Sequence, residues 1–592
     1  MSIESHSALE GSQAERRLEI GYYLDNFELA LKTVLRRDSD LFDVDERNRL
    51  SLFETTDLSG RRLLVRLFAR RPGWHRVSLL KYEEIPDCEK VCLRLSQIGL
   101  LDSFQGESKE LTEVVSSLRL SECRHLMAEA GMPTRGKLLE LQEQVCAVVE
   151  ANRIKQVDCF VKLADRQLYR RVFLLFFANR RQNLSDFVVR DLGNLQYEKY
   201  SLSAQHLFSS RQQSIDCLQR ADWRDEIFAQ RDQGSDTALP NAARTALELL
   251  ETITISDCSH RGRRLLTSPL VVLVREGVAL LERLGNHEDA VCMLERLLQC
   301  DISTEHNVHA TQRLLIDLAK TGRPARALRL VKRAMSDTSD PVLLHDLKKR
   351  RYRLSRRMKL HAQRPPALLI PVERRFEAVR LATPPGKRNR FFDEDGNECD
   401  VETVAIRCYE KSGEYRGVHV ENDLPAALVA ACFWDIIFMD LDGAFLHAFQ
   451  SGPLDWGGPA FYLHRIDAIQ QRLSEIREGR HMDRCLDILK AKAGIVNPLF
   501  SWNQVSTEIV KQTLLNWPGA SLADCLEPVI QDTGSWKRGF PDLILFSPRG
   551  EIIISEVKGP GDKVSPAQSM WFDLLLKNGM SVELCNVDAN QA

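Results

Sequence analysis

The sequence Gly539-Phe540-Pro541-Asp542-Leu543-Ile544-Leu545-Phe546, followed after a short turn by Ile552-Ile553-Ile554-Ser555-Glu556-Val557-Lys558-Gly559, decides the fold of the carboxy-terminal region. Both halves are rich in the branched and aromatic residues that favour strands. The intervening segment 547–550 contains the proline and glycine of a turn. The two halves therefore predict a β-hairpin.

This hairpin would place two carboxylates beside a lysine. Side chains alternate along a strand, so Glu556 and Lys558 share one face and Val557 points to the other. Asp542 would lie opposite Glu556, and neighbouring carboxylates repel unless a cation neutralises them. Because Mg²⁺ and Mn²⁺ take oxygen ligands, we predict a metal site formed by Asp542, Glu556 and the Val557 carbonyl. On these residues alone, the solvated face of an ordinary strand stays open as the alternative.

A helix start follows the hairpin. Ser565 as N-cap, Pro566 at the first helical position and Gln568 three residues after the cap have the pattern of a capping box. Gln568 therefore has either this structural role alone or a supporting role at the site on the preceding strand.

These motifs resemble the PD-(D/E)xK nuclease signature in its VRR-NUC form, through Pro541-Asp542, Glu556-Val557-Lys558 and Gly559-Pro560. An upstream segment, Gly417-Val418-His419-Val420-Glu421-Asn422, followed by an apolar helix, is similar to the Fanconi-associated nucleases of DNA repair. The resemblance implies that Glu421 completes the metal site. By itself Glu421 would be a charge near a helix N-terminus, and Val420 stands where the family pattern has a glycine.

The resemblance also implies an activity. Asp542, Glu556 and Lys558 would be catalytic, Glu421, Asp542, Glu556 and Val557 would hold one or two Mg²⁺ or Mn²⁺ ions, and Gln568 would support them. The family hydrolyses DNA phosphodiesters as a 5′-flap endonuclease and 5′-to-3′ exonuclease in interstrand-crosslink repair. Two alternatives remain: a Holliday-junction resolvase-like nuclease, and a non-catalytic DNA-binding repair scaffold.

The composition is that of a large protein and lacks the strongly positive net charge of many nucleic-acid-binding proteins. The chain has 592 residues, 44% of them hydrophobic, and a formal net charge of -2, so a DNA-binding surface must be a local patch. The 15 cysteines are scattered and fit neither a zinc ribbon nor a disulfide framework. The longest apolar run, 426–439, is interrupted by Asp435 and is too short to span a membrane, so it predicts a buried helix.

Four domains are predicted: an N-terminal DNA-binding domain at 1–105, a SAP-like domain at 106–150, a helical TPR-like domain at 151–365, and a VRR-NUC nuclease domain at 370–592. The fold class is thus multidomain and mainly α, with SAP-like and TPR-like helical regions before a C-terminal α/β restriction-endonuclease-like domain. The TPR-like prediction rests on a repeat that places Gly285 and Gly322 in equivalent turns. The predicted DNA contacts are Arg135, Lys137, Arg275, Arg323, Lys537 and Arg538.

The expected partners follow from the resemblance. They are branched or flapped DNA and other repair proteins, without a membrane, and the chain would act as a monomer or as a DNA-induced dimer. The cysteine spacing of the ubiquitin-binding zinc finger of animal members does not occur, so a compact bacterial-type member is expected. Such a protein would be cytoplasmic and nucleoid-associated, or nuclear in a eukaryote.

Overall fold

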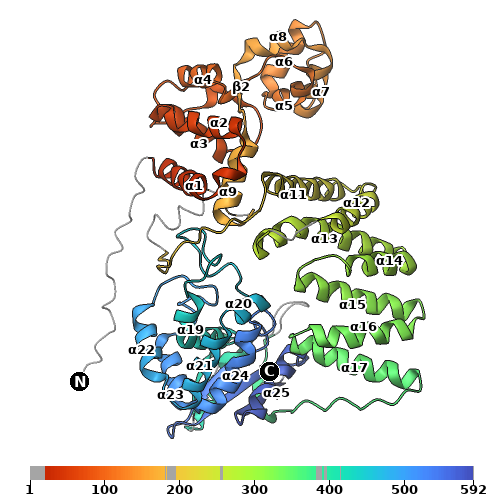
Figure 1. Cartoon of the computed structure of the whole chain (residues 1–592), viewed down its shortest axis with the longest axis vertical. Helices are drawn as coiled ribbons and strands as arrows, with labels where there is room; N and C mark the ends of the chain where they lie inside the picture. The colour runs from red at the N-terminus through yellow and green to blue at the C-terminus, as the bar shows by residue number, and fades with distance from the viewer. Residues whose placement is uncertain are drawn as a thin grey trace. The chain divides into compact units, whose positions relative to one another are not determined.

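The computed structural model describes residues 21–180, 182, 184, 195–253, 258–381, 390–392, 396–413 and 415–590. These residues form two compact units (Figure 1). The first comprises the described parts of Met1–Leu195, Ala204–Gln219 and Asp257–Gly262. The second comprises the described parts of Gln196–Ser203, Arg220–Ser256 and Arg263–Ala592. Residues 1–20 of the predicted N-terminal domain lie outside the described residues.

The first unit begins with helices around a small antiparallel sheet of order β1-β3-β2. Helix α9 packs against α1, and β3 pairs with both β1 and β2. The elements are α1 (Tyr22–Asp38), η1 (Ser39–Leu41), α2 (Val44–Thr55), α3 (Leu58–Ala69), β1 (His75–Arg76), η2 (Val77–Leu79), α4 (Cys88–Gln97), β2 (Leu101–Ser103), β3 (Phe160–Leu163) and α9 (Arg166–Phe177).

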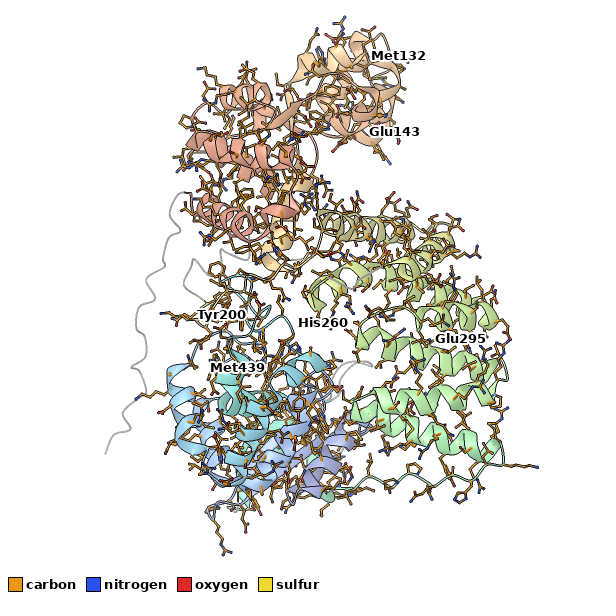
Figure 2. All side chains as sticks on the ribbon, in the orientation of Figure 1. Met132, Glu143, Tyr200, His260, Glu295 and Met439 are labelled. Carbon is orange, nitrogen blue, oxygen red and sulfur yellow. The ribbon has the colours of Figure 1, made fainter. Side chains whose placement is uncertain are left out.

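Between β2 and β3, where the sequence predicts the SAP-like domain, the chain forms a helical pair joined by a turn. Leu126 of the first helix and Leu141 of the second are buried in one small core. The turn between them carries Met132, which is 41% exposed (Figure 2). The elements are α5 (Ser108–Ser116), α6 (Leu120–Glu129), α7 (Leu138–Val148) and α8 (Ala151–Val157).

The middle of the chain is a series of helical hairpins, as the repeat predicts. Gly285 and Gly322 occupy equivalent turns with φ of 77° and 69°, a left-handed conformation that glycine adopts without a Cβ penalty. The equivalent Ala290 and Ala327 are buried between helices. The elements are α11 (Arg211–Asp232), which contributes residues to both units, α12 (Leu239–Thr252), α13 (His260–Arg283), α14 (His287–Leu297), α15 (Thr304–Lys320), α16 (Pro324–Asp337) and α17 (Pro341–Arg357).

The carboxy-terminal domain is built on a mixed five-stranded sheet of order β4-β10-β9-β8-β7. Strand β10 is parallel to β4 and β9, whereas β8 is antiparallel to both β9 and β7. A separate pair, β5 with β6, is antiparallel. The strands are β4 (Val372–Val379), β5 (Phe391–Phe392), β6 (Glu398–Cys399), β7 (Arg416–His419), β8 (Leu543–Phe546), β9 (Ile552–Lys558) and β10 (Ser581–Asn590).

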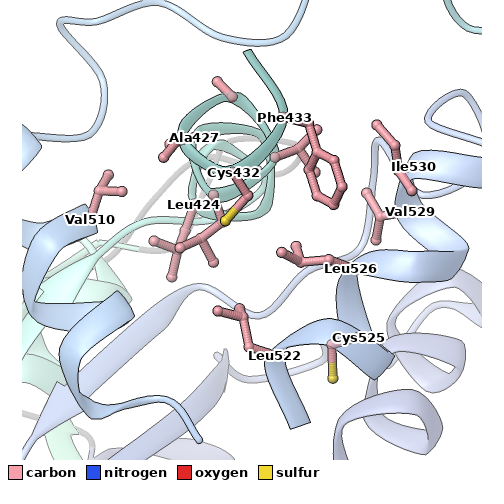
Figure 3. Close-up of a cluster of buried hydrophobic side chains, with 14 of the residues drawn as sticks. Leu424, Ala427, Cys432, Phe433, Val510, Leu522, Cys525, Leu526, Val529 and Ile530 are labelled. Carbon is pink, nitrogen blue, oxygen red and sulfur yellow. The ribbon is translucent and has the colours of Figure 1, made fainter. Parts of the chain in front are cut away.

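Helices surround this sheet, and the predicted apolar helix lies at the centre of their core. Leu424 and Phe433 of α19 are fully buried and pack toward α23 and α24 (Figure 3). None of the helices in the described ranges is long and apolar enough for a membrane span. The helices are α18 (Val401–Lys411), α19 (Asp423–Ile437), α20 (Pro459–His464), α21 (Ile466–Arg477), α22 (Met482–Ala491), α23 (Thr507–Asn516), α24 (Gly519–Gln531) and α25 (Pro566–Lys577).

Two segments of the predicted helical domain at 151–365 have their contacts elsewhere. Strand β3 completes the sheet of the first unit, so residues after 150 still belong there. Tyr200 stacks on Phe445 of the carboxy-terminal domain with ring centroids 3.9 Å apart, and its hydroxyl accepts from Gln450 N at 2.7 Å. Pairing of strands and stacking of rings that are distant in the sequence decide which domain each of these segments joins. Helical periodicity predicts neither kind of contact.

Candidate active site

The predicted hairpin is present, and its register brings Asp542 opposite Glu556. Strands β8 and β9 are antiparallel with Leu543 paired to Ser555, so the residue before β8 lies beside Glu556. The backbone N–H of Val557 donates to Asp542 Oδ2 at 2.8 Å. This hydrogen bond fixes the Asp542 side chain at the end of the hairpin.

Glu556 is a buried carboxylate with only one of its oxygens satisfied. Lys558 Nζ donates to Oε1 at 2.6 Å, and the side-chain amide of Gln568 donates to the same oxygen. Oε2 is buried without a hydrogen-bond partner among the residues that the structure describes. An unpaired buried oxygen costs about 1–3 kcal/mol, more when charged, so this atom fits a cation or a water that the chain itself does not supply.

Strand β7 brings Glu421 to the same place. Because His419 pairs with Leu543, the residues after β7 reach the start of β8. The N–H groups of Val420 and Glu421 both donate to the Asp542 carbonyl, at 2.8 and 3.2 Å. These bonds hold Glu421 at φ 41°, a left-handed conformation that is unfavourable for a residue other than glycine.

A glycine positions the hairpin against the next helix. Gly539 has φ 92°, and a Cβ there would lie 2.7 Å from both the carbonyl carbon and Cβ of Ala567. Only glycine therefore fits at this close approach of the hairpin to the first turn of α25. That contact places Gln568 within reach of Glu556.

Gln568 forms the predicted capping box and also reaches the preceding strand. Its Oε1 accepts from Ser565 N at 2.8 Å, and its own N–H donates to Ser565 Oγ at 3.2 Å, which is the predicted capping box. Its amide nitrogen donates to Glu556. One side chain thus joins the start of α25 to the buried carboxylate.

His419 belongs to this cluster and was not predicted from the sequence. Its Nε2 lies 3.1 Å from Glu421 Oε1. Ligand atoms of His419, Glu421 and Asp542 all lie within 4.8 Å of one another, which would let the three hold one ion. The available signal was the short spacing, because His419 ends β7 only two residues before Glu421.

The surroundings of the site disfavour the ionised forms of its carboxyl groups. Burial raises the pKa of Glu556 to about 8, the Asp542 charge adds to the rise, and Lys558 opposes it. Burial also raises the pKa of Asp542 to about 6, against the hydrogen bond from Val557. Since ionised carboxylates are costly here, a divalent cation would stabilise the ionised cluster. The oxygen-rich donor set suits a hard ion.

The predicted DNA contacts are spread over several elements. Lys537 and Arg538 are exposed shortly before the hairpin, where Arg538 O accepts from Trp571 Nε1 at 3.2 Å. Arg135 and Lys137 are exposed in the turn between α6 and α7, within the first unit. Their part in DNA binding stays a prediction.

The two predicted contacts on the helical hairpins have neighbours inside the protein. Arg323 forms an ion pair with Glu288. The charge of Arg275 adds to the effect of burial in lowering the pKa of His306. It does the same for His309. Their contact with DNA also stays a prediction.

Comparison with known proteins agrees with this arrangement. The VRR-NUC domain family matches residues 476–589, and the family described as "FAN1, HTH domain" matches residues 21–102. The Fanconi-associated nuclease 1 homolog of Pseudomonas aeruginosa is 27% identical over 595 residues, covering 96% of this chain and 95% of the relative. The chain is therefore similar to Fanconi-associated nucleases over nearly its whole length. Its carboxy-terminal domain is therefore a VRR-NUC nuclease domain.

Eukaryotic members of the Fanconi-associated nuclease family are longer. The Arabidopsis thaliana homolog is 28% identical, with 95% of this chain and 67% of the relative covered. The human protein is 26% identical, and the match covers 96% of this chain and 62% of the relative. This chain thus spans about two thirds of the plant and human proteins.

A solved structure shares the fold across nearly the whole chain. A crystal structure of paFAN1 bound to 2nt 5′ flap DNA with gap has a TM-score of 0.77 and 24% sequence identity, and covers 96% of this chain and 98% of that one. The fold class is therefore mainly helical and multidomain, with a mixed α/β nuclease domain at the carboxy-terminal end.

Proposed function

We propose that the chain hydrolyses DNA phosphodiesters with the hairpin of β8 and β9 and the adjoining Glu421, in a PD-(D/E)xK site that needs Mg²⁺ or Mn²⁺. The observation that carries this proposal is Glu556, a buried carboxylate held on one oxygen by Lys558 and left unpartnered on the other. A buried oxygen of this kind needs a partner, and a cation held also by Asp542 and Glu421 would supply one.

The residues that would hold the ion are Glu421, Asp542, Glu556 and the Val557 carbonyl, with His419 as a further donor. When bound, the ion would neutralise charge on the phosphate and lower the pKa of a water molecule. We predict that the site holds one or two ions.

The chain's own groups would arrange the reacting atoms. Lys558, half-buried beside Glu556, would orient the attacking water or stabilise the developing phosphate charge with its amino group. The amide of Gln568 would hold the Glu556 carboxylate in place during this step. Asp542 is held in turn by Val557 N–H. These fixed hydrogen bonds need no reorganisation when substrate arrives.

We further propose 5′-flap DNA as the substrate and DNA repair as its setting. Support comes from the relatives named Fanconi-associated nuclease 1 and from the paFAN1 structures with 5′ flap DNA. Interstrand-crosslink repair and 5′-to-3′ exonuclease action are part of the same proposal. The SAP-like and TPR-like helical regions would position the branched duplex.

Cleavage of labelled flap, four-way and linear duplexes, with and without Mg²⁺ or Mn²⁺, tests the proposal. Asp542→Asn and Lys558→Ala should each reduce cleavage of the flap by at least about a hundredfold while flap binding remains, because they remove groups that act in the transition state. Asp487→Asn changes an exposed residue and Lys511→Ala a half-buried one, both outside the site, and these variants should cleave normally. Full cleavage by both site variants would refute the assignment.

A further inference from the structure

Helix α17 carries several basic side chains, and only some of them form ion pairs with other described residues. Arg350 Nε lies 2.5 Å from Asp346 Oδ2. Lys349, Arg353 and Arg357 are exposed, and no carboxylate of the described residues lies within ion-pair distance of them. These cations are therefore available to an anionic ligand.

A large cleft beside these residues is lined by α17, the segment 364–371 and α25. Helix α25 packs against α17 (Figure 1). The volume of the cleft is about 1180 Å³. Sites for one small ligand usually measure about 300–1,000 Å³, so the cleft has room for a chain segment. Its titratable lining residues are His345, Lys349, Tyr352, Arg353 and Arg364, with no aspartate or glutamate among the described residues that line it.

An aromatic ring stands among these cations. Tyr352 is half-buried in the cleft, between Lys349 and Arg353 along the same face of α17. Proteins bind single-stranded nucleic acids in positively charged grooves where bases stack on aromatic side chains. An acidic peptide would use the cations but has no need of the ring.

The cationic surface continues beyond the cleft. A second cavity of about 220 Å³ also has Arg353 in its lining, together with Arg323, Arg350 and Arg357. Arg353 therefore lines both cavities along α17.

The cleft also adjoins the catalytic hairpin through α25. Ser569 lines the cleft, and the residue before it, Gln568, donates its side-chain amide to Glu556. A strand held in the cleft would thus lie beside the helix that supports the buried carboxylate.

We propose that the α17 cleft, defined by Lys349, Tyr352, Arg353 and Arg364, binds the unpaired strand of the DNA substrate through phosphate contacts and base stacking. The choice of DNA rests on the proposed nuclease function. The binding chemistry rests on the cations and the ring.

The test is binding of a fluorescent twelve-residue oligothymidylate to the full chain in EDTA, followed by anisotropy. Lys349→Ala/Arg353→Ala should weaken binding about tenfold or more. It should also reduce the slope of log affinity against log salt by about 1.4, or 0.7 for each of two lost phosphate contacts. The matched control is Lys348→Ala/Arg356→Ala, which removes the same charge from the same helix at positions that line neither cavity. Equal weakening by the control pair would overturn the proposal.

Tyrosine variants separate the strand from an acidic peptide. Tyr352→Ala should weaken oligothymidylate binding about tenfold, and Tyr352→Phe should retain it, because stacking needs the ring and not the hydroxyl. Poly-glutamate should compete poorly. If poly-glutamate binds as tightly as the oligonucleotide and Tyr352→Ala changes neither, the cleft is an acidic-peptide site and the proposal fails.

Cleavage assays keep this proposal distinct from the nuclease function. Asp542→Asn should bind oligothymidylate like the wild type, since the cleft does not need the metal site. A wild-type chain that fails to bind oligothymidylate overturns the cleft proposal even if it cuts flap DNA. One that binds as expected but cuts no DNA supports the cleft and refutes the nuclease function.

Discussion

The side-chain amide of Gln568 donates a hydrogen bond to Glu556 while the same residue closes the capping box at the start of α25. The two functions use different atoms of one side chain, because Oε1 accepts from Ser565 N and Nε2 donates to the carboxylate. They can therefore be separated by substitution.

Gln568→Glu should keep the cap and damage the site. A glutamate can accept from Ser565 N as the glutamine does, but it replaces a donor to Glu556 with a second negative charge. We expect cleavage to fall about 10–100-fold, as is typical when a group supporting a metal ligand is lost. The midpoint of urea unfolding in EDTA at pH 6 should change little. The measurement pairs flap-cleavage rates with that unfolding curve.

Ser565→Ala is the complementary variant. It removes the side-chain acceptor of the cap and should cost about 1 kcal/mol of stability, while the amide of Gln568 still reaches Glu556. Cleavage by folded protein should therefore be near normal. If the two variants lose cleavage and stability in the same proportion, the two functions of Gln568 are not separable.

Cation binding should strengthen steeply as pH rises from about 6 to above 8. The raised pKa values, about 6 for Asp542 and about 8 for Glu556, mean that these carboxyls hold protons that a cation must displace. Calorimetric titration with Mn²⁺ in buffers of different ionisation enthalpy would report both affinity and protons released. Near pH 7 we expect release of up to one proton for each ion bound.

The variant Glu556→Gln supplies the control for that titration. It has no proton to lose at this position, so proton release near pH 7 should largely vanish together with most of the affinity. An affinity of the wild-type chain that is flat between pH 6 and 8.5 would contradict the prediction.

Asp542→Asn should stabilise the metal-free chain at alkaline pH. Because the folded-state pKa is raised, the favourable contribution of the protonated carboxyl is present below the unfolded pKa of about 3.9 and is lost as pH rises through about 6. Asparagine stays uncharged and still offers an oxygen to Val557 N–H. We expect a gain of roughly 1–3 kcal/mol at pH 8 in EDTA, from 1.36 kcal/mol for each pKa unit.

Urea unfolding of both proteins at pH 4 and pH 8 measures this gain, which should be small at pH 4. Asp487→Asn, an exposed change, should show no such dependence. A destabilised Asp542→Asn at pH 8 would show that the charge of Asp542 is satisfied within the chain. The same unfolding curves show whether lost cleavage arises from lost folding.

The sequence predicts the hairpin because its signals are local. Alternation fixes the faces of Glu556 and Lys558, and the turn at 547–550 fixes the approximate register that brings Asp542 beside them. The capping box is equally local. These features need no knowledge of the remaining chain.

Features set by distant pairing are not readable in this way. His419 joins the site because β7 pairs with β8, more than a hundred residues later in the sequence, and Glu421 entered the prediction only through resemblance. Strand β3 follows the SAP-like helices in the sequence but pairs with the sheet that precedes them. It therefore belongs to the first unit, although the predicted domain boundary at 150 placed it in the next domain. The energy of such pairings depends on which strands meet, and periodicity within one segment does not contain that information.

His419→Ala should change which cations the site prefers. Imidazole nitrogen suits late transition metals, whereas Mg²⁺ prefers oxygen. If His419 donates its Nε2 to an ion beside Glu421 and Asp542, the variant should bind Co²⁺ about 10–100-fold more weakly and Mg²⁺ only slightly more weakly. Competition titrations and the visible absorption of bound Co²⁺ measure both effects without cleavage. Equal losses of affinity for Co²⁺ and Mg²⁺ would instead make His419 a residue that orients Glu421, because an oriented carboxylate binds both cations. An unchanged Co²⁺ spectrum would exclude His419 from the ligands of the ion.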